Sequence, residues 1–223
     1  MRLRWLGHAC FVLEGSKRVV VDPYVPSGTG DLAPDIVAVT HGHADHMGDT
    51  VALRAKTVAG NEIAKYLASR GIDSVALNLG GSIDLEGVRF TMTPALHSGW
   101  LEEAGHGFYG GCAAGFVIRM DGISVYHAGD TAVFSDMTLI RDLYRPDVAL
   151  LPIGGRFTMG PEEAMMAANF IGAPLVIPMH YNTWPAIAQD PTAFRQALER
   201  TTDIRVRVLE PGESIDLDEL KKK

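Results

Sequence analysis

The most informative segment of this chain reads Val39-Thr40-His41-Gly42-His43-Ala44-Asp45-His46-Met47-Gly48. It follows the apolar run 36–39 and carries three imidazoles and one carboxylate within residues 41–46. Alternate side chains of an extended backbone share a face, so His41 and His43 are expected to point the same way. Asp45 and His46 follow where the chain should turn. The segment can therefore supply ligands to two adjacent metal ions. A polar surface loop is the weaker interpretation, because the protein has only eight histidines.

The pattern His-x-His-x-Asp-His in 41–46 resembles the metal-binding signature of the metallo-β-lactamase superfamily. That family takes three further ligands from the ends of later strands: a histidine, an aspartate and a histidine. This chain offers them in that order, each after a β-like run, as His97, Asp130 and His180.

Five further segments, spread over essentially the whole chain, narrow the resemblance to the compact metal-dependent hydrolases related to ascorbate-6-phosphate lactonase. They are Trp5-Leu6-Gly7-His8-Ala9-Cys10-Phe11, Val21-Asp22-Pro23-Tyr24, His127-Ala128-Gly129-Asp130-Thr131, Pro152-Ile153-Gly154-Gly155 and His180-Tyr181-Asn182-Thr183-Trp184-Pro185. The resemblance implies an α/β fold of the four-layer αββα sandwich type, formed by residues 1–223 as a single domain.

The resemblance also implies a ligand set for two divalent ions. It assigns three ligands to one ion, three to the other and one bridging carboxylate: His41, His43 and His97; Asp45, His46 and His180; and Asp130. Imidazole and carboxylate ligands suit zinc best, with manganese and iron as alternatives. Two such ions can hold one hydroxide between them and polarise a substrate oxygen. Asp45 and Asp130 are therefore the candidate catalytic residues, Asp45 as the group that guides the proton.

Four residues are candidates for contact with substrate: His8, Arg156, Tyr181 and Asn182. Two of them have a plainer interpretation as well: His8 lies between apolar pairs and could be a buried core residue, and Arg156 could be a surface residue of a loop. Tyr181 and Asn182 directly follow the candidate ligand His180. Two charges per ion, two carboxylates and one hydroxide leave the centre positive, which favours an anionic substrate.

Two more polar residues of the quoted segments have open roles. Asp22 is either a turn residue or a carboxylate that orients a metal-bound imidazole. His127 is expected to lie outside the ligand set.

The composition limits the partners and the location. The chain has 223 residues, 47% hydrophobic content and a net charge of −7. This charge disfavours a long nucleic-acid partner, because phosphate binding needs clustered Lys and Arg. Two cysteines do not make a disulfide framework. The chain begins with strand-like residues, without a signal peptide and without an apolar run of about 18 residues, which predicts a cytoplasmic protein with no membrane partner. A homo-oligomer stays open.

The local pattern predicts many short strands with interspersed helices. An Asp-Gly turn at 121–122 predicts a hairpin. Residues 61–69 predict a helix with Asn61 as its N-cap. The glycine-rich segment 98–112 predicts either an active-site lid or a surface loop.

The leading hypothesis is a metal-dependent hydrolase acting on a small, anionic ester, lactone or phosphoester. The alternatives are a nuclease or phosphodiesterase acting on nucleic acid, and a noncatalytic metabolite- or metal-binding module. The complete ligand set argues against the last, and the acidic charge argues against the nuclease.

Overall fold

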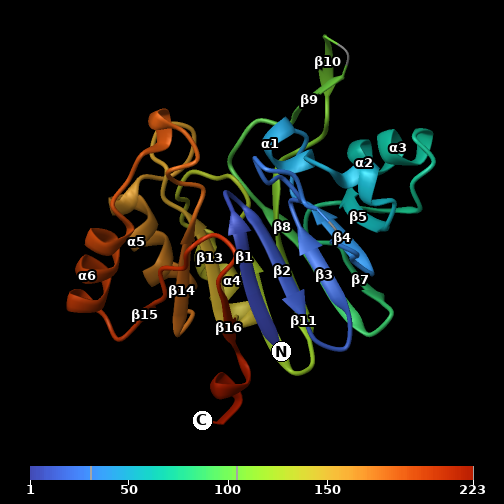
Figure 1. The fold of residues 1–223 in the computed structure, drawn as a ribbon. Helices are drawn as coiled ribbons and strands as arrows, with labels where there is room; N and C mark the ends of the chain where they lie inside the picture. Colours follow the sequence, from blue (N-terminus) through green and yellow to red (C-terminus); the bar gives the residue numbers. More distant parts are fainter. Residues whose placement is uncertain (31, 104, 223) are drawn as a thin grey trace.

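Two seven-stranded sheets lie face to face in the computed structural model of the chain, which describes residues 1–30, 32–103 and 105–222 (Figure 1). The first sheet runs in the order β16 (Ser214–Asp216), β1 (Arg2–Gly7), β2 (Cys10–Glu14), β3 (Arg18–Val21), β4 (Ile36–Val39), β5 (Lys56–Gly60) and β6 (Ser74–Leu77). The second runs in the order β15 (Arg205–Val206), β14 (Leu175–Met179), β13 (Val148–Pro152), β12 (Ile123–His127), β11 (Ala114–Met120), β8 (Val88–Pro94) and β7 (Ser82–Leu85).

Helices cover the outer faces of both sheets. The helices of the described residues are α1 (Ala44–Met47), α2 (Thr50–Leu53), α3 (Asn61–Ser69), α4 (Met137–Tyr144), α5 (Pro161–Ile171) and α6 (Pro191–Thr201), and two 3₁₀ turns are η1 (Pro185–Ile187) and η2 (Asp218–Lys222). Helix α3 packs on β5 and β6, and α5 and α6 pack on β13 and β15. This arrangement confirms the predicted αββα sandwich.

Alternate side chains of strand β4 pack into two different hydrophobic clusters, one on each face of the first sheet. Ile36 and Ala38 belong to the cluster between the sheets, whereas Val37 and Val39 belong to the cluster under α3. Successive strand residues point to opposite faces, and a strand buried on both faces reads as a continuous apolar run.

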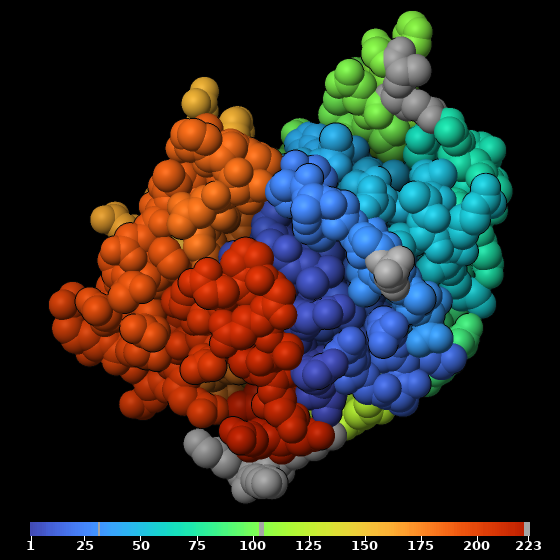
Figure 2. All heavy atoms as spheres, in the orientation of Figure 1, coloured from blue at the N-terminus to red at the C-terminus, as the bar shows by residue number. Residues whose placement is uncertain are grey.

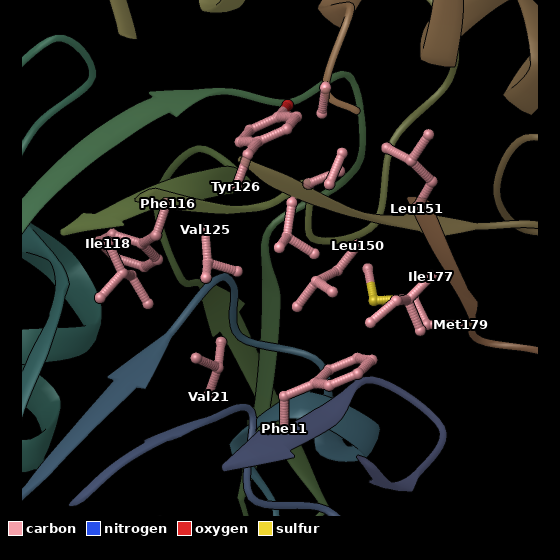
Figure 3. Packing of buried hydrophobic residues seen from close by; sticks show 14 of the residues in the cluster. Phe11, Val21, Phe116, Ile118, Val125, Tyr126, Leu150, Leu151, Ile177 and Met179 are labelled. Atoms are coloured by element: carbon pink, nitrogen blue, oxygen red, sulfur yellow. The ribbon is translucent and has the colours of Figure 1, made fainter. Parts of the chain in front are cut away.

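The main core lies between the two sheets. Figure 3 shows Phe11 and Val21 of the first sheet directed toward Phe116, Val125 and Leu150 of the second. At the edge of the first sheet, β16 pairs with β1, so the C-terminal segment lies against the N-terminal strand, red against dark blue in Figure 2. No helix in the described part of the chain is both long and apolar enough to span a membrane.

Of two local predictions, the hairpin turn is confirmed and the helix N-cap is not. The turn residues Asp121 and Gly122 have φ of 53° and 79° between β11 and β12, as a hairpin turn with two left-handed residues requires. Helix α3, however, has Gly60 at the N-cap, and the Asn61 side chain donates to Glu62 instead. The N-cap assignment of Asn61 is therefore wrong by one residue.

The segment 98–112 forms a hairpin rather than a loop without structure. Strands β9 (Trp100–Glu103) and β10 (His106–Tyr109) pair and stand out from the body of the protein (Figures 1 and 2); residue 104 lies outside the described residues. Gly99 serves close packing, because a Cβ there would collide with the carbonyl of Gly111. Phe108 contacts Tyr66 of α3, with 5.8 Å between the ring centroids.

Candidate metal centre

The predicted ligands meet at one edge of the sandwich. The segment 41–46 follows β4, and His97, Asp130 and His180 come shortly after β8, β12 and β14 respectively. Strands β3 to β5 run parallel, as do β12 to β14, so their carboxyl ends share an edge within each sheet. His43 is the N-cap of the short helix α1, which turns Asp45 and His46 away from the direction of β4.

Three imidazoles form the first cluster. His43 Nδ1 lies 3.0 Å from His41 Nε2 and 3.2 Å from His97 Nε2. Three ring nitrogens this close together can bind one zinc ion or a similar transition-metal ion.

A second cluster contains Asp45, His46 and His180, and His8 lies within the same group. Asp130 joins the two clusters. Its Oδ1 is 3.2 Å from His46 Nε2, and its Oδ2 is 3.0 Å from His180 Nε2 and 3.6 Å from His97 Nε2. A carboxylate in this position can contact two ions.

Buried polar atoms without partners test whether a metal fits. Among the described residues, His46 Nε2, His180 Nε2 and Asp130 Oδ1 are buried and have no hydrogen-bond partner of acceptable geometry, although they approach one another closely. Such atoms are rare in native interiors and need an explanation. Buried imidazole nitrogens and carboxylate oxygens gathered in such groups are the ligands that zinc and related ions take, so these residues fit a metal ion.

Asp22 fixes the orientation of His46. Its Oδ2 lies 2.7 Å from His46 Nδ1 and accepts the Thr40 hydroxyl at 2.7 Å, while Oδ1 accepts the Thr40 backbone N–H at 2.8 Å. All three residues are fully buried. Asp22 therefore orients an imidazole rather than serving only as a turn residue. Its hydrogen bond to His46 Nδ1 leaves Nε2 of the same ring free to bind a metal.

His8 holds Asp45 in a similar way. Its Nε2 is 3.0 Å from Asp45 Oδ2 and its Nδ1 is 2.8 Å from the Thr183 hydroxyl. An ionised carboxylate only accepts, so Nε2 carries the proton and Nδ1 accepts from Thr183. The carbonyl of His8 accepts the backbone N–H of His180 at 2.9 Å. His8 is therefore connected to two members of the second cluster.

The backbone at this edge is unusual. His8, Asp22 and His180 have φ of 50°, 47° and 57°, a left-handed conformation that non-glycine residues rarely adopt. Such residues concentrate at functional sites, where the surrounding structure enforces them.

The charges of the metal-free centre divide between the two clusters. Burial lowers the pKa of His41, His43 and His97. Burial also acts to lower the pKa of His180, but Asp130 and Asp45 outweigh it and raise that pKa to about 9. The second cluster therefore holds cationic imidazole in the place that a metal ion would take.

The metal-free protein is expected to lose stability as the pH rises through about 9. The pKa of His180 rises from 6.5 to about 9 on folding, so its contribution is complete below pH 6.5 and disappears as the folded group loses its proton. The melting temperature of chelator-treated protein should fall between pH 7 and 10, and His180→Gln should remove much of that fall. An identical fall in the variant would contradict the assignment.

The remaining predicted residues lie in other surroundings. Tyr181 and Asn182 line a neighbouring cavity of about 510 Å³, where Tyr181 stacks on Trp5 with 5.4 Å between the ring centroids. The guanidinium of Arg156 lies over the ring of Phe157, 5.4 Å from its centroid. His127 is fully buried, contacts the carbonyl of Ala9 at 2.9 Å and lies outside the ligand clusters.

A cavity of about 310 Å³ opens over the ligands. Three residues that the sequence did not single out as site residues line it: Ser98, Phe157 and Trp184. Ser98 follows a predicted ligand and lies 3.2 Å from His43 Nε2. Trp184 lies within the segment that begins at His180. Phe157 carried no sequence signal beyond its position next to Arg156.

Relatives of known class share this chain's sequence and fold. Residues 2–180 match the family model described as the beta-lactamase superfamily domain. The chain is 68% identical over 217 residues to a UPF0173 metal-dependent hydrolase of Methanoculleus marisnigri, with 97% of each chain covered. It is 45% identical over 228 residues to one of Pelotomaculum thermopropionicum, covering 97% of this chain and 100% of that relative.

A solved structure agrees with these relatives. Igni18, a metallo hydrolase of the hyperthermophilic archaeon Ignicoccus hospitalis, superimposes with a TM-score of 0.87 at 36% identity, covering 96% of this chain and 97% of that one. The αββα fold and the sequence match place the protein in one class: the chain belongs to the metallo-β-lactamase superfamily. More particularly, its relatives make it a metal-dependent hydrolase of the UPF0173 group.

Proposed function

We propose that the protein is a dinuclear hydrolase that acts on a small ester, lactone or phosphoester. The observation that carries the proposal is the pair of ligand clusters joined by Asp130 on the floor of one cavity. One ion would be held by His41, His43 and His97, the other by Asp45, His46 and His180. Zinc is the first choice for this donor set, with manganese or iron as alternatives decided by availability.

When bound, the ions supply Lewis acidity and a water molecule activated at neutral pH. The protein's own residues prepare the reaction around them. Asp45 faces the cavity and accepts the proton of the attacking water, while His8 holds its Oδ2. The water oxygen bonds to the carbonyl carbon or phosphorus, the bond to the leaving oxygen breaks, and the proton passes to that oxygen. Asp22 keeps His46 in the tautomer that a ligand needs.

The size and charge of the protein support a small substrate. A cavity of about 310 Å³ suits a metabolite rather than a polymer, and a net charge of −7 repels long polyanions. Among the described residues that line the cavity there is no Lys or Arg, so attraction of negative charge there would come from the metal centre. The anionic substrate and the cytoplasmic location stay predictions, and the oligomeric state stays open.

A substrate panel tests the proposal. Protein reconstituted separately with zinc, manganese and iron(II) should hydrolyse lactones, esters or phosphoesters, and elemental analysis should find two ions per chain. Structured RNA and single-stranded DNA serve as competitors at equal metal occupancy and fixed salt. Efficient cleavage of the polymers without turnover of small molecules would favour the nuclease instead.

Removing the His8 imidazole is expected to weaken the second metal site. His8→Ala leaves Asp45 Oδ2 without its donor, and loss of such a partner typically costs about 10–100-fold in metal affinity or activity. His8→Gln, which can donate from its amide, should recover part of the loss. Chelator competition measures the affinity, and the exposed His106→Ala is the matched control. Unchanged affinity for both ions in His8→Ala would show that the contact is incidental.

A further inference from the structure

We infer that the substrate carries an apolar alkyl or aromatic group next to the bond that is hydrolysed, and that Phe157 and Trp184 bind it. This inference rests on the proposed hydrolysis at the same site and narrows its substrate class. The composition of the cavity walls, the exposure of Phe157 and the position of Trp184 support it.

The walls of the cavity differ from its floor. Five of the lining residues belong to the ligand set: His43, Asp45, His97, Asp130 and His180. The others are Ser98, Phe157 and Trp184, and no Lys or Arg occurs among the described lining residues. A phosphate or carboxylate distant from the reacting bond would meet no cation there, and an unpaired charge is costly to bury. An aromatic wall favours an apolar group instead.

Phe157 is the wall residue that exposes a large apolar surface to solvent. Its side chain is half exposed, at 50%, although it belongs to a cavity over buried ligands. An apolar group in the cavity would remove part of this surface from water, which is the main driving force for binding such a group. Arg156 contacts the Phe157 ring, with its guanidinium 5.4 Å from the ring centroid, but it does not line the cavity. The lining carboxylates, Asp45 and Asp130, belong to the ligand set on the floor.

Trp184 forms a fixed part of the wall. Its ring centroid lies 4.9 Å from that of His8 and 6.5 Å from that of His180, and the side chain is half buried. These contacts hold the indole beside the metal ligands, so an apolar group that touches it lies close to the reacting bond. Aromatic side chains favour offset or edge-to-face contact with a second ring.

A series of esters with one common leaving group measures the preference. We expect kcat/KM of the zinc-loaded protein to rise at least about tenfold from an acetate to a phenylacetate ester, mainly through KM, as apolar pockets discriminate by such factors. Phe157→Ala should reduce the ratio of the two values at least about fivefold. Leu139→Ala, an equally exposed apolar residue on α4, should leave the ratio unchanged. A phosphate-bearing sugar lactone should be a poorer substrate than a lactone with an alkyl chain.

Product binding separates this inference from the proposed function. Calorimetry with zinc-loaded protein should show tighter binding of phenylacetate than of acetate, with the difference reduced in Phe157→Ala, whether or not any ester is turned over. Equal binding of the two carboxylates, or preference for the phosphate-bearing lactone, would overturn the apolar wall. Absence of turnover throughout the panel, with the phenylacetate preference intact, would instead contradict the hydrolysis proposed.

Discussion

Asp130→Asn is expected to lower kcat/KM on the order of 10³-fold, which corresponds to about 4 kcal/mol of transition-state stabilisation. The carboxylate lies within 3.6 Å of ring nitrogens of His46, His180 and His97, so it contacts members of both clusters. Asparagine keeps the shape but replaces one charged oxygen by an N–H₂ group, which cannot bind a metal ion. The variant should retain its fold, because the side chain touches the site rather than the apolar core.

Metal content must be measured together with activity in that variant. Elemental analysis should show loss of one ion, and His46→Ala should behave similarly. Asp136→Asn, an exposed carboxylate in the loop that follows, is the matched control and should have wild-type values. Full activity in Asp130→Asn with one ion demonstrably missing would contradict a mechanism that uses two.

Removal of the metal is expected to lower the melting temperature by about 10 °C. Ions bound at a thousand times their dissociation constant stabilise the folded state by about 4 kcal/mol, and a chain of this length changes by about 2–4 °C for each kcal/mol. The ligands come from strand ends in both sheets, so bound ions hold the two halves of the sandwich together. Without them, the partnerless atoms of His46, His180 and Asp130 stay buried.

Calorimetry before and after dialysis against a chelator measures this effect. Restoring the metal should restore the melting temperature, and Asp130→Asn should show a smaller difference between the two states. An unchanged melting temperature after verified metal removal would mean that the centre contributes nothing to the fold.

The metal ligands could be predicted because their chemistry is local. The segment 41–46 carries four of them on consecutive or alternate positions, and His97, Asp130 and His180 each follow a recognisable strand. The strand pattern and the Asp-Gly turn depend on the same short-range rules, which predict a mixed α/β domain. The two-sheet sandwich was implied by the family resemblance. Glycine spacing in 98–112 was ambiguous, because a projecting hairpin and a loop use the same residues.

Tertiary structure alone decided which residues support and surround those ligands. His8 and Asp45 are 37 positions apart, and Asp22 and His46 are 24 apart. A local sequence pattern therefore cannot predict either hydrogen bond. Phe157 and Trp184 come from loops after different strands, and they line one cavity only because those strand ends share an edge. The chemical type of a metal ligand depends on single residues and on their spacing along the chain, and both can be seen in the sequence. Orientation and cavity lining are properties of distances between segments, which exist only once the sheets have packed.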